Sequence, residues 1–439
     1  MHDVLVVGLG AMGSATLHAL AERGVDVVGV DALDPPHSLG STHGRSRIIR
    51  EAYYEHPAYV PLVRSAYAAW ARLEAAAGVQ LFLRTGGLNV GARDSALVAG
   101  ALASAERHGL DVEVLTGSEI NRRYPAFTVP ADMVGVFEPS AGVLFPEACI
   151  SAFLKVARSH GADVRPDTRV TALVRSAHGI HATTSAGELR ARRVVICAGP
   201  WTASLLSMFG MALPLVVTRQ TMHWLAPAAD ASLARPDRFP VALIEHDDGH
   251  IFYTMPDMGD GVKAAIHHEG AAVDPELVDR AIQAADTQVV ENLVARFLPG
   301  AGTRIHESVV CLYTNTPDHD FIIDTGDGMP DVESSARARD MASSSRAPSG
   351  RWRRRWRLES LRRRTSRSSR RVASGRRVRM PRGRGTFGFC GADGRKQSLP
   401  ARLTDVAPTY QELIVTVAPG TITMRKEWAA RLATPRAPE

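Results

Sequence analysis

A strand, a glycine-rich turn and a helix open this sequence, and they restrict its fold more than any other feature. Residues 4–7 form an apolar run, and Gly8, Gly10 and Gly13 follow in a Gly-x-Gly-x-x-Gly pattern ahead of a helical stretch. The first glycine permits a tight turn, the second lets the backbone approach a pyrophosphate, and the third lets the helix pack on the strand. The helix N-terminus then offers free N–H groups to the phosphates. The opening therefore predicts a dinucleotide site in a Rossmann-like α/β domain.

A second apolar run, residues 25–30, ends at Asp31. An acid in this position accepts hydrogen bonds from a ribose 2′-OH and disfavours a 2′-phosphate, so we do not expect NADP. FAD and NAD both remain open at this point, because both contain the same adenosine diphosphate. A glycine cluster that only packs a helix is the alternative interpretation.

The composition excludes several classes of protein. The 439 residues have room for two or three domains. No apolar run approaches the roughly 20 residues that a membrane span needs, and the N-terminus lacks the basic region of a signal peptide. We therefore expect a cytoplasmic protein with no membrane partner. No disulfide framework or metal site is expected either, because the four cysteines are widely scattered. They are Cys149, Cys197, Cys311 and Cys390.

Charge is distributed unevenly along the chain. Between Arg337 and Arg384 there are 19 arginines and only two acidic residues, Asp340 and Glu359. This tract therefore carries +17 within a chain of net charge +6, which leaves −11 for the remaining residues. A change of composition this abrupt marks a boundary between the C-terminal part and the rest of the sequence.

Five further motifs extend the interpretation beyond the nucleotide site. They follow one another along the chain at residues 40–53, 118–125, 137–145, 195–201 and 310–314. Together these strings resemble those of the monomeric sarcosine oxidase and N-methyltryptophan oxidase family, flavoenzymes that oxidise N-methyl amino acids. The resemblance covers residues 3–332, and it implies FAD as the cofactor.

The resemblance implies two interleaved domains. One is a glutathione-reductase-type FAD-binding domain, and the other is a substrate domain built on a mostly antiparallel sheet. We expect the FAD domain at residues 1–83 and 146–215, the substrate domain at 84–145 and 216–310, and a return to the FAD domain at 311–332.

The cofactor residues are carried over from the same resemblance. Cys311 matches the cysteine that family members link to the flavin 8α-methyl group through a thioether, and Val170 matches a valine whose backbone meets the adenine. His43 and Arg47 match residues beside the flavin ring and its linkage. From residue type alone, the alternatives are a buried small hydrophobe for Cys311 and a solvated basic loop for His43 and Arg47.

Two cations are expected to act on the substrates. Lys263 matches a lysine that family members hold near the flavin for the reaction with oxygen, where a fixed ammonium in a site of low dielectric would stabilise superoxide. A surface lysine is the alternative. Arg50 is the candidate for the substrate carboxylate, because its planar fork suits a carboxylate and a buried charge needs an anionic partner.

Three further residues are expected to border the substrate pocket. His267 lies four residues beyond Lys263, on the same face of a predicted strand. Tyr253 and Tyr313 match tyrosines of the same pocket, although a core aromatic would give the same pattern as Tyr253. His268 would point the other way and lie on the surface.

The implied reaction is the oxidation of a secondary amino acid such as sarcosine or N-methyltryptophan. The substrate loses the equivalent of a hydride to the flavin, and the resulting imine is hydrolysed to a primary amino acid and formaldehyde. Reduced flavin passes two electrons to O₂ and gives hydrogen peroxide. An FAD-dependent amino acid dehydrogenase with another electron acceptor is the alternative. We expect a monomer that requires no metal.

The resemblance ends after residue 332. Family members continue into a strand and then the motif Ser-Gly-His-Gly-Phe-Lys-Phe, whose lysine is a second anchor for the substrate carboxylate. This chain enters the Arg-rich tract instead. Permitted codons for residues 339–345 can encode Gly-His-Gly-Phe-Lys-Phe one base out of frame, so we hypothesise a one-base slip in the gene. Resequencing that stretch would test the hypothesis.

Residues 333–439 are then expected to be mostly without ordered structure. Without the second anchor, the helix dipole and the last strand of the FAD domain, we expect the polypeptide as written to be unstable or nearly inactive. The alternative is an Arg-rich arm that binds nucleic acid through phosphate contacts and through stacking on Trp352 and Trp356. A salt-dependent shift of labelled DNA or RNA by residues 333–439 would support that alternative.

Overall fold

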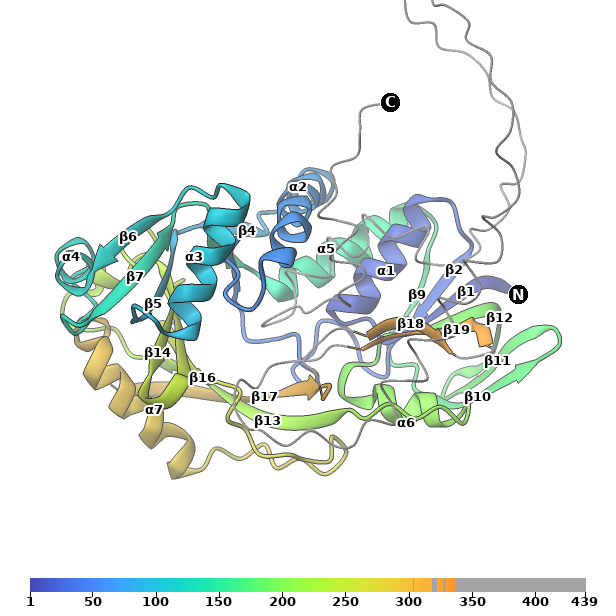
Figure 1. Ribbon diagram of the computed structural model, residues 1–439. Coiled ribbons are helices and arrows are strands. Elements are labelled where there is room, and N and C mark those ends of the chain that lie inside the picture. Colours follow the sequence, from blue (N-terminus) through green and yellow to red (C-terminus); the bar gives the residue numbers. More distant parts are fainter. Residues whose placement is uncertain (303, 318–321, 327–328, 337–439) are drawn as a thin grey trace, which may run out of the picture. The chain divides into compact units, whose positions relative to one another are not determined.

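The structure of the protein is a computed structural model that describes residues 1–302, 304–317, 322–326 and 329–336. The Arg-rich tract lies outside these residues, and so do the hypotheses of a frame slip and of a nucleic-acid-binding arm. The described elements form two large sheets, a small one, and the helices that pack on them (Figure 1).

The first sheet contains the opening nucleotide unit. β1 (His2–Val7) pairs in parallel with β2 (Val27–Val30) on one side and with β12 (Gly187–Ile196) on the other. Strands that are buried on both faces need a continuous apolar run, and residues 4–7 supply one. The sheet continues in both directions with β11 (Gly179–Thr184) and β10 (Val170–Ser176) beyond β12, and with β9 (Asp163–Arg165) beyond β2.

Two strands from the end of the described chain complete this sheet. β19 (Met329–Ala336) pairs in parallel with β12, and β18 (Ile322–Gly326) pairs with β19. The expected loss of the last strand is therefore wrong, because Val332 is fully buried opposite Val194 and the ladder continues through Ser334. Residues 333–336 belong to this strand rather than to a segment without structure.

The second sheet is antiparallel except where β14 pairs with β5. The two sheets together confirm the predicted fold class. In order across the second sheet, the strands are β17 (Ile305–Asn315), β13 (Val216–Leu225), β16 (Val262–His267), β15 (His250–Met255), β14 (Val241–His246), β5 (Gly87–Ala92), β7 (Met133–Glu138) and β6 (Glu113–Thr116). The small sheet contains β3 (Arg47–Ile49), β8 (Gly142–Leu144) and β4 (Phe82–Arg84).

Cys311 lies inside β17, a strand of the second sheet. The segment 311–332 therefore begins on the second sheet and reaches the first sheet at β18. The proposed domain boundaries themselves remain predictions.

The helices cover the sheets in two groups (Figure 1). The first group contains α1 (Ala11–Glu22), α2 (Val60–Ala77), α5 (Pro146–Ser159) and α6 (Thr202–Ser207). α1 packs on β1 and β2, and α6 packs on β12 and β19. α5 packs on α1, and α2 packs on α5. In the second group, α3 and α4 pack on β7, and α7 packs on β13 and β16; their bounds are α3 (Ala96–His108), α4 (Gly117–Arg123) and α7 (Ala284–Phe297). Short 3-10 turns lie at Pro57–Tyr59, Gly199–Trp201, Ala231–Ala234, Asp247–Gly249 and Pro299–Ala301.

The second sheet has two different faces. One face places Val262 and Ala264 of β16 in a core with residues of α7. The other face places Tyr253, Ala265 and Cys311 in a core that packs against β3. Because side chains alternate along a strand, Lys263 and His267 share this second face with Ala265. The strand pairing therefore gathers the chemically active residues on one side of the sheet.

Candidate active site

The glycine turn has the geometry that its sequence predicts. Gly8 has φ +90, and a Cβ at this position would lie 2.6 Å from the carbonyl oxygen of Cys197. A Cβ on Gly13 would lie 1.7 Å from the carbonyl oxygen of Gly8, so the third glycine allows α1 to pack close to the turn. Gly10 is the N-cap of α1, and no side chain caps the helix there. The N-terminus of α1 is therefore open to an anionic group.

A cavity of about 250 Å³ opens beside this turn. Gly8, Gly10, Asp31 and Val170 all line it, so the structure brings these predicted cofactor residues together. The carboxylate of Asp31 accepts hydrogen bonds from the N–H groups of Leu9 (2.7 Å) and Leu33 (3.1 Å), which fixes its position at the end of β2.

Four polar atoms that line this cavity are buried and lack a hydrogen-bond partner among the described residues. They are Ser41 Oγ, Trp201 Nε1, Thr314 Oγ1 and Ser335 Oγ. A buried polar group without a partner costs about 1–3 kcal/mol, so such groups in a cavity indicate a polar ligand. The residues present therefore fit an FAD, which would bring oxygen and nitrogen atoms to these positions.

The loop before β3 is wrapped around the guanidinium of Arg47. Arg47 donates hydrogen bonds to the carbonyl oxygens of Ser41 (3.0 Å), His43 (2.6 Å) and Ser46 (2.8 Å). His43 and Arg47 are both buried, so the alternative of a solvated basic loop is wrong. Burial, aided by Arg47 and then Lys263, lowers the pKa of His43 to about 3. His43 is therefore neutral beside two cations.

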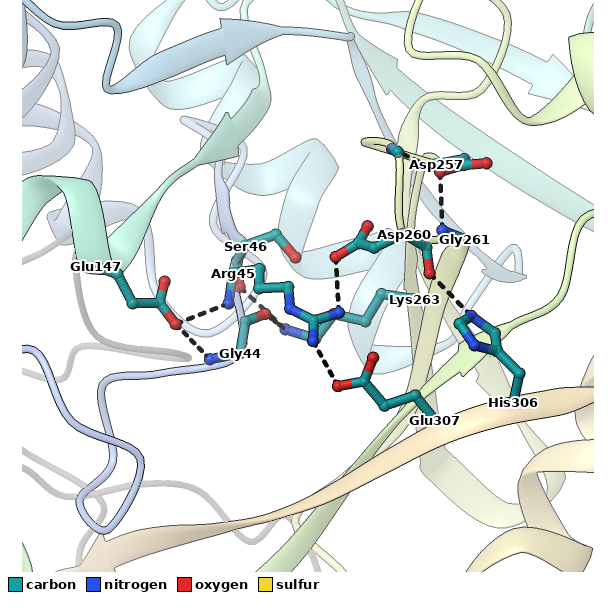
Figure 2. Close-up of polar contacts among 11 residues, drawn as sticks. Gly44, Arg45, Ser46, Glu147, Asp257, Asp260, Gly261, Lys263, His306 and Glu307 are labelled. Atoms are coloured by element: carbon teal, nitrogen blue, oxygen red, sulfur yellow. Dashed lines mark hydrogen bonds and ion pairs between the residues drawn. The ribbon is translucent and has the colours of Figure 1, made fainter.

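Lys263 is 1% exposed, which makes the alternative of a surface lysine wrong. Its Nζ donates hydrogen bonds to the carbonyl oxygens of Gly44 (2.7 Å) and Ser46 (3.1 Å) (Figure 2). No carboxylate oxygen lies within hydrogen-bonding distance of Nζ in the part of the chain that the structure describes. Burial, and after it Arg47, lowers the pKa of Lys263 well below its usual value.

Arg45 forms an outer layer over this lysine. Its side chain lies over the ring of Trp224, at 4.6 Å from the ring centroid. It also forms ion pairs with Asp260 (3.0 Å) and with Glu307 (Figure 2). Lys263 Nζ lies 5.5 Å from the centroid of the same ring. One cation thus stays buried while its neighbour is half-exposed and paired with acids.

The thiol of Cys311 is buried close to these cations. Its Sγ lies 3.5 Å from the carbonyl oxygen of Ser41, a residue that lines the cavity. Burial raises the pKa of the thiol, and Arg47 and Lys263 act in the opposite direction. These cations distinguish Cys311 from an ordinary core cysteine such as Cys149, whose pKa is raised by burial with carboxylates nearby.

Arg50 lies beyond the other end of β3 and has a carboxylate of its own. Its Nη2 is 3.1 Å from both carboxylate oxygens of Glu55. The guanidinium also stacks on Tyr53 and Tyr54, at 4.4 and 5.2 Å from the ring centroids. Burial opposes the charge, but Glu55 and the other acidic groups around Arg50 leave its pKa raised. Sequence reasoning missed Glu55, because no motif identifies the partner of a buried arginine.

The predicted aromatic residues form one cluster. The ring of His267 lies 6.0 Å from that of Tyr253 and 6.1 Å from that of Tyr313. The expected surface position of His268 is wrong, because its ring lies 3.8 Å from His267 and 5.7 Å from Tyr313. The alternation fails here because β16 ends at His267, and His268 adopts a left-handed backbone with φ +79.

Within the described ranges, no group of three or more His, Cys, Asp or Glu residues is placed to hold a metal ion. In the same ranges, no helix combines the length and the apolar composition that crossing a membrane requires.

A glycine cradle for a dinucleotide, joined to a mostly antiparallel sheet, defines a flavin-dependent oxidoreductase. Residues 3–335 match the model of the FAD dependent oxidoreductase family (DAO), and the chain belongs to this family. The predicted FAD-dependent enzyme is thereby confirmed.

Two groups of relatives place the chain within that family. Monomeric sarcosine oxidase of Bacillus sp. strain B-0618 is 37% identical over 326 residues, which cover 73% of this chain and 83% of that protein. N-methyl-L-tryptophan oxidase of Yersinia pestis strain Pestoides F is 34% identical over 331 residues, which cover 74% of this chain and 86% of that protein. These relatives confirm the predicted resemblance.

Solved structures share the fold. NikD, an amino acid oxidase essential for nikkomycin biosynthesis, superposes with a TM-score of 0.69 at 24% identity, over 77% of this chain and 89% of that chain. L-proline dehydrogenase from P. horikoshii superposes with a TM-score of 0.66 at 19% identity, over 76% of this chain and 87% of that chain.

Proposed function

We propose that this protein oxidises N-methyl or other secondary amino acids with bound FAD and passes the electrons to O₂. With an N-methyl amino acid, the products are hydrogen peroxide and an imine, which water hydrolyses to a primary amino acid and formaldehyde. The observation that carries this proposal is the buried ammonium of Lys263, whose hydrogen bonds among the described residues go only to carbonyl oxygens, on the sheet face that also carries Cys311. A positive charge without a carboxylate contact suits a place where negative charge develops.

Arg50 is proposed to bind the substrate carboxylate. Its planar fork can form two parallel hydrogen bonds to a carboxylate, and in this structure its Nη2 contacts both carboxylate oxygens of Glu55. A substrate carboxylate would therefore replace Glu55 on Arg50. Tyr253, His267 and Tyr313 would then border the amine and exclude water from it.

FAD, when bound, supplies the electron acceptor for the amine and the donor for oxygen. Cys311 is proposed to attach it through a thioether. Burial raises the pKa of this thiol, and the positive charges of Arg47 and Lys263 act against that rise and favour the thiolate form that such a bond requires. The hydroxyl groups of Ser41 and Thr314 would form hydrogen bonds with the cofactor.

Acid precipitation tests the cofactor and its linkage together. Flavin absorbance is expected to stay with the washed, acid-denatured pellet of the wild type and to leave it in Cys311→Ala. Cys149→Ala is the matched control, because Cys149 is also buried but has carboxylates near its thiol in place of Arg47 and Lys263. A colourless wild-type pellet would contradict the covalent linkage.

The electron acceptor requires a separate assay. We expect peroxide to form, slowly because the second carboxylate anchor is expected to be missing, when sarcosine or N-methyltryptophan is added aerobically. Reduction of an artificial dye without peroxide would support the dehydrogenase alternative. The buried ammonium of Lys263, with no carboxylate hydrogen-bonded to it among the described residues, favours the oxidase.

A further inference from the structure

The carboxylate of Glu147 holds one end of the loop that contacts Lys263. Its Oε1 accepts hydrogen bonds from the N–H groups of Gly44 (2.7 Å) and Arg45 (3.0 Å) (Figure 2). Both donors have left-handed backbones, with φ +96 and +66. For a residue other than glycine this conformation costs about 1–2 kcal/mol, so Arg45 adopts it only where other contacts require it. Glu147 supplies such a contact.

The peptide groups of this loop connect Glu147 to Lys263. The N–H of Gly44 points toward Glu147, while its carbonyl oxygen accepts a hydrogen bond from Nζ of Lys263. The loop has little room to shift, because a Cβ on Gly44 would lie 2.6 Å from Cε of Met222 and 3.3 Å from Nζ. The direction of the carbonyl groups therefore depends on the carboxylate behind them.

We propose that Glu147 is a positioning residue for Lys263 in the reaction of the reduced cofactor with oxygen. It fixes the two carbonyl oxygens that hold the ammonium, and it adds a negative charge behind them. This inference rests on the proposed oxidase function. Two of the three N–H donors of the ammonium are used by Gly44 and Ser46, which leaves one to face the developing anion.

The charges around Lys263 allow the proposal to be tested by the pH dependence of the reaction with oxygen. The ionisable groups that act on its ammonium are Arg47 from β3, His43 from the loop before it, Cys311 from β17, Glu147 from α5, and Asp260 from the turn before β16. Burial and Arg47 lower the pKa of Lys263, whereas Cys311, Glu147 and Asp260 raise it. Loss of the Glu147 charge would lower this pKa further, so the ammonium would be lost at a lower pH.

Glu138 offers a matched control at the other end of the same segment. It is 1% exposed, and its two oxygens accept hydrogen bonds at 2.7 Å from the N–H groups of Glu51 and Ala52. It therefore holds the chain next to Arg50, not the loop at Lys263. Between the two carboxylates, β8 pairs with β3. Glu138→Gln should disturb the substrate end of the segment and leave the oxygen reaction unchanged.

The kinetic test starts from the full chain loaded with FAD and reduced by light without oxygen, so that it does not depend on substrate binding. After mixing with O₂, we expect reoxidation to slow about tenfold in Glu147→Gln and about a hundredfold in Glu147→Ala, and to change less than about twofold in Glu138→Gln. The Glu147→Gln rate should also fall off at a lower pH than that of the wild type. Lys263→Met is the reference variant, in which the contribution of the ammonium to the reoxidation rate is lost completely.

A second readout uses the FAD-free chain. Hydrogen exchange should show faster exchange at the amides of Gly44 and Arg45 in Glu147→Ala and unchanged exchange there in Glu138→Gln. If Glu147→Ala does not fold, Glu147→Gln still provides the rate and the pH profile.

The outcomes separate the two proposals. Wild-type reoxidation rates in both Glu147 variants, with a slow Lys263→Met, would overturn the role of Glu147 and leave the oxidase proposal intact. Unchanged exchange at Gly44 and Arg45 in Glu147→Ala would also overturn it. A Lys263→Met variant that is as fast as the wild type would instead contradict the proposed function.

Discussion

Two buried cations lie beside opposite ends of β3, and they are neutralised in different ways. Arg50 contacts both oxygens of Glu55, a carboxylate that is buried with it. Lys263 donates hydrogen bonds only to the carbonyl oxygens of Gly44 and Ser46 among the described residues. The first arrangement suits the exchange of one carboxylate for another. The second keeps a positive charge available for an anion that forms during a reaction.

Removal of Arg50 should have the largest effect on stability. Arg50→Met would leave Glu55 as a buried charge without this partner, which costs about 3–5 kcal/mol of the free energy of unfolding. Urea unfolding of the FAD-free chain measures this loss. Arg64→Met is the control, because Arg64 is half-exposed where it pairs with Glu51 and should cost less than about 1 kcal/mol. An equal loss of unfolding free energy in the two variants would show that the buried pair of Arg50 and Glu55 contributes no more to stability than the exposed pair does.

Removal of Lys263 should affect the reaction and not the fold. Lys263→Met should leave the stability unchanged or higher, because both carbonyl oxygens that accept from Lys263 keep another donor. The carbonyl oxygen of Gly44 still accepts from the N–H of Ser46 (2.7 Å), and the carbonyl oxygen of Ser46 still accepts from Arg47 (2.8 Å). Reoxidation of the reduced cofactor by O₂ should slow by about 10²–10³-fold, measured by stopped flow. Lys155→Met is the control, since Lys155 contacts a carbonyl at the end of α2.

The same lysine predicts the pH dependence of the oxygen reaction. Burial lowers the pKa of Lys263, so the ammonium is present at low pH and is lost as the pH rises through this lowered pKa, before the ordinary value of 10.5. The rate with O₂ should therefore fall with rising pH in the wild type. A similar fall in Lys263→Met would assign the titration to another group.

His43 provides the smallest expected effect and tests the burial of this loop together with the positive charges of Arg47 and Lys263. Its pKa is lowered to about 3, so between pH 6.5 and that value the unfolded chain takes up a proton that the folded chain does not. Stability should therefore fall as the pH falls, by about 2 kcal/mol between pH 8 and pH 5. His43→Gln should lose this part of the acid dependence in urea unfolding of the FAD-free chain, whereas the exposed His178→Gln should keep it.

Sequence analysis succeeded where the evidence was contiguous. The glycine turn, its two strands and Asp31 lie within the first 31 residues, and each part has a local physical reason. It failed where a local rule was overridden. Alternation placed His268 on the surface, but the strand ends one residue earlier and the backbone turns. The end of the resemblance after residue 332 led us to expect no last strand, yet Val332 still occupies a buried position next to β12.

The sequence by itself determined the dinucleotide site and the fold class, because the glycine turn and its strands form a short contiguous motif. The resemblance then supplied FAD and most of the residues gathered at the candidate site. The monomeric state, the cytoplasmic location and the roles of these residues remain predictions. Only the tertiary structure decided the partners: Glu55 for Arg50, two carbonyl oxygens for Lys263, and Glu147 for the loop between them. Glu147 and Gly44 are 103 positions apart, and Lys263 and Gly44 are 219 apart. Contacts over such separations depend on which strands pair and in which register, and a one-dimensional pattern does not specify either.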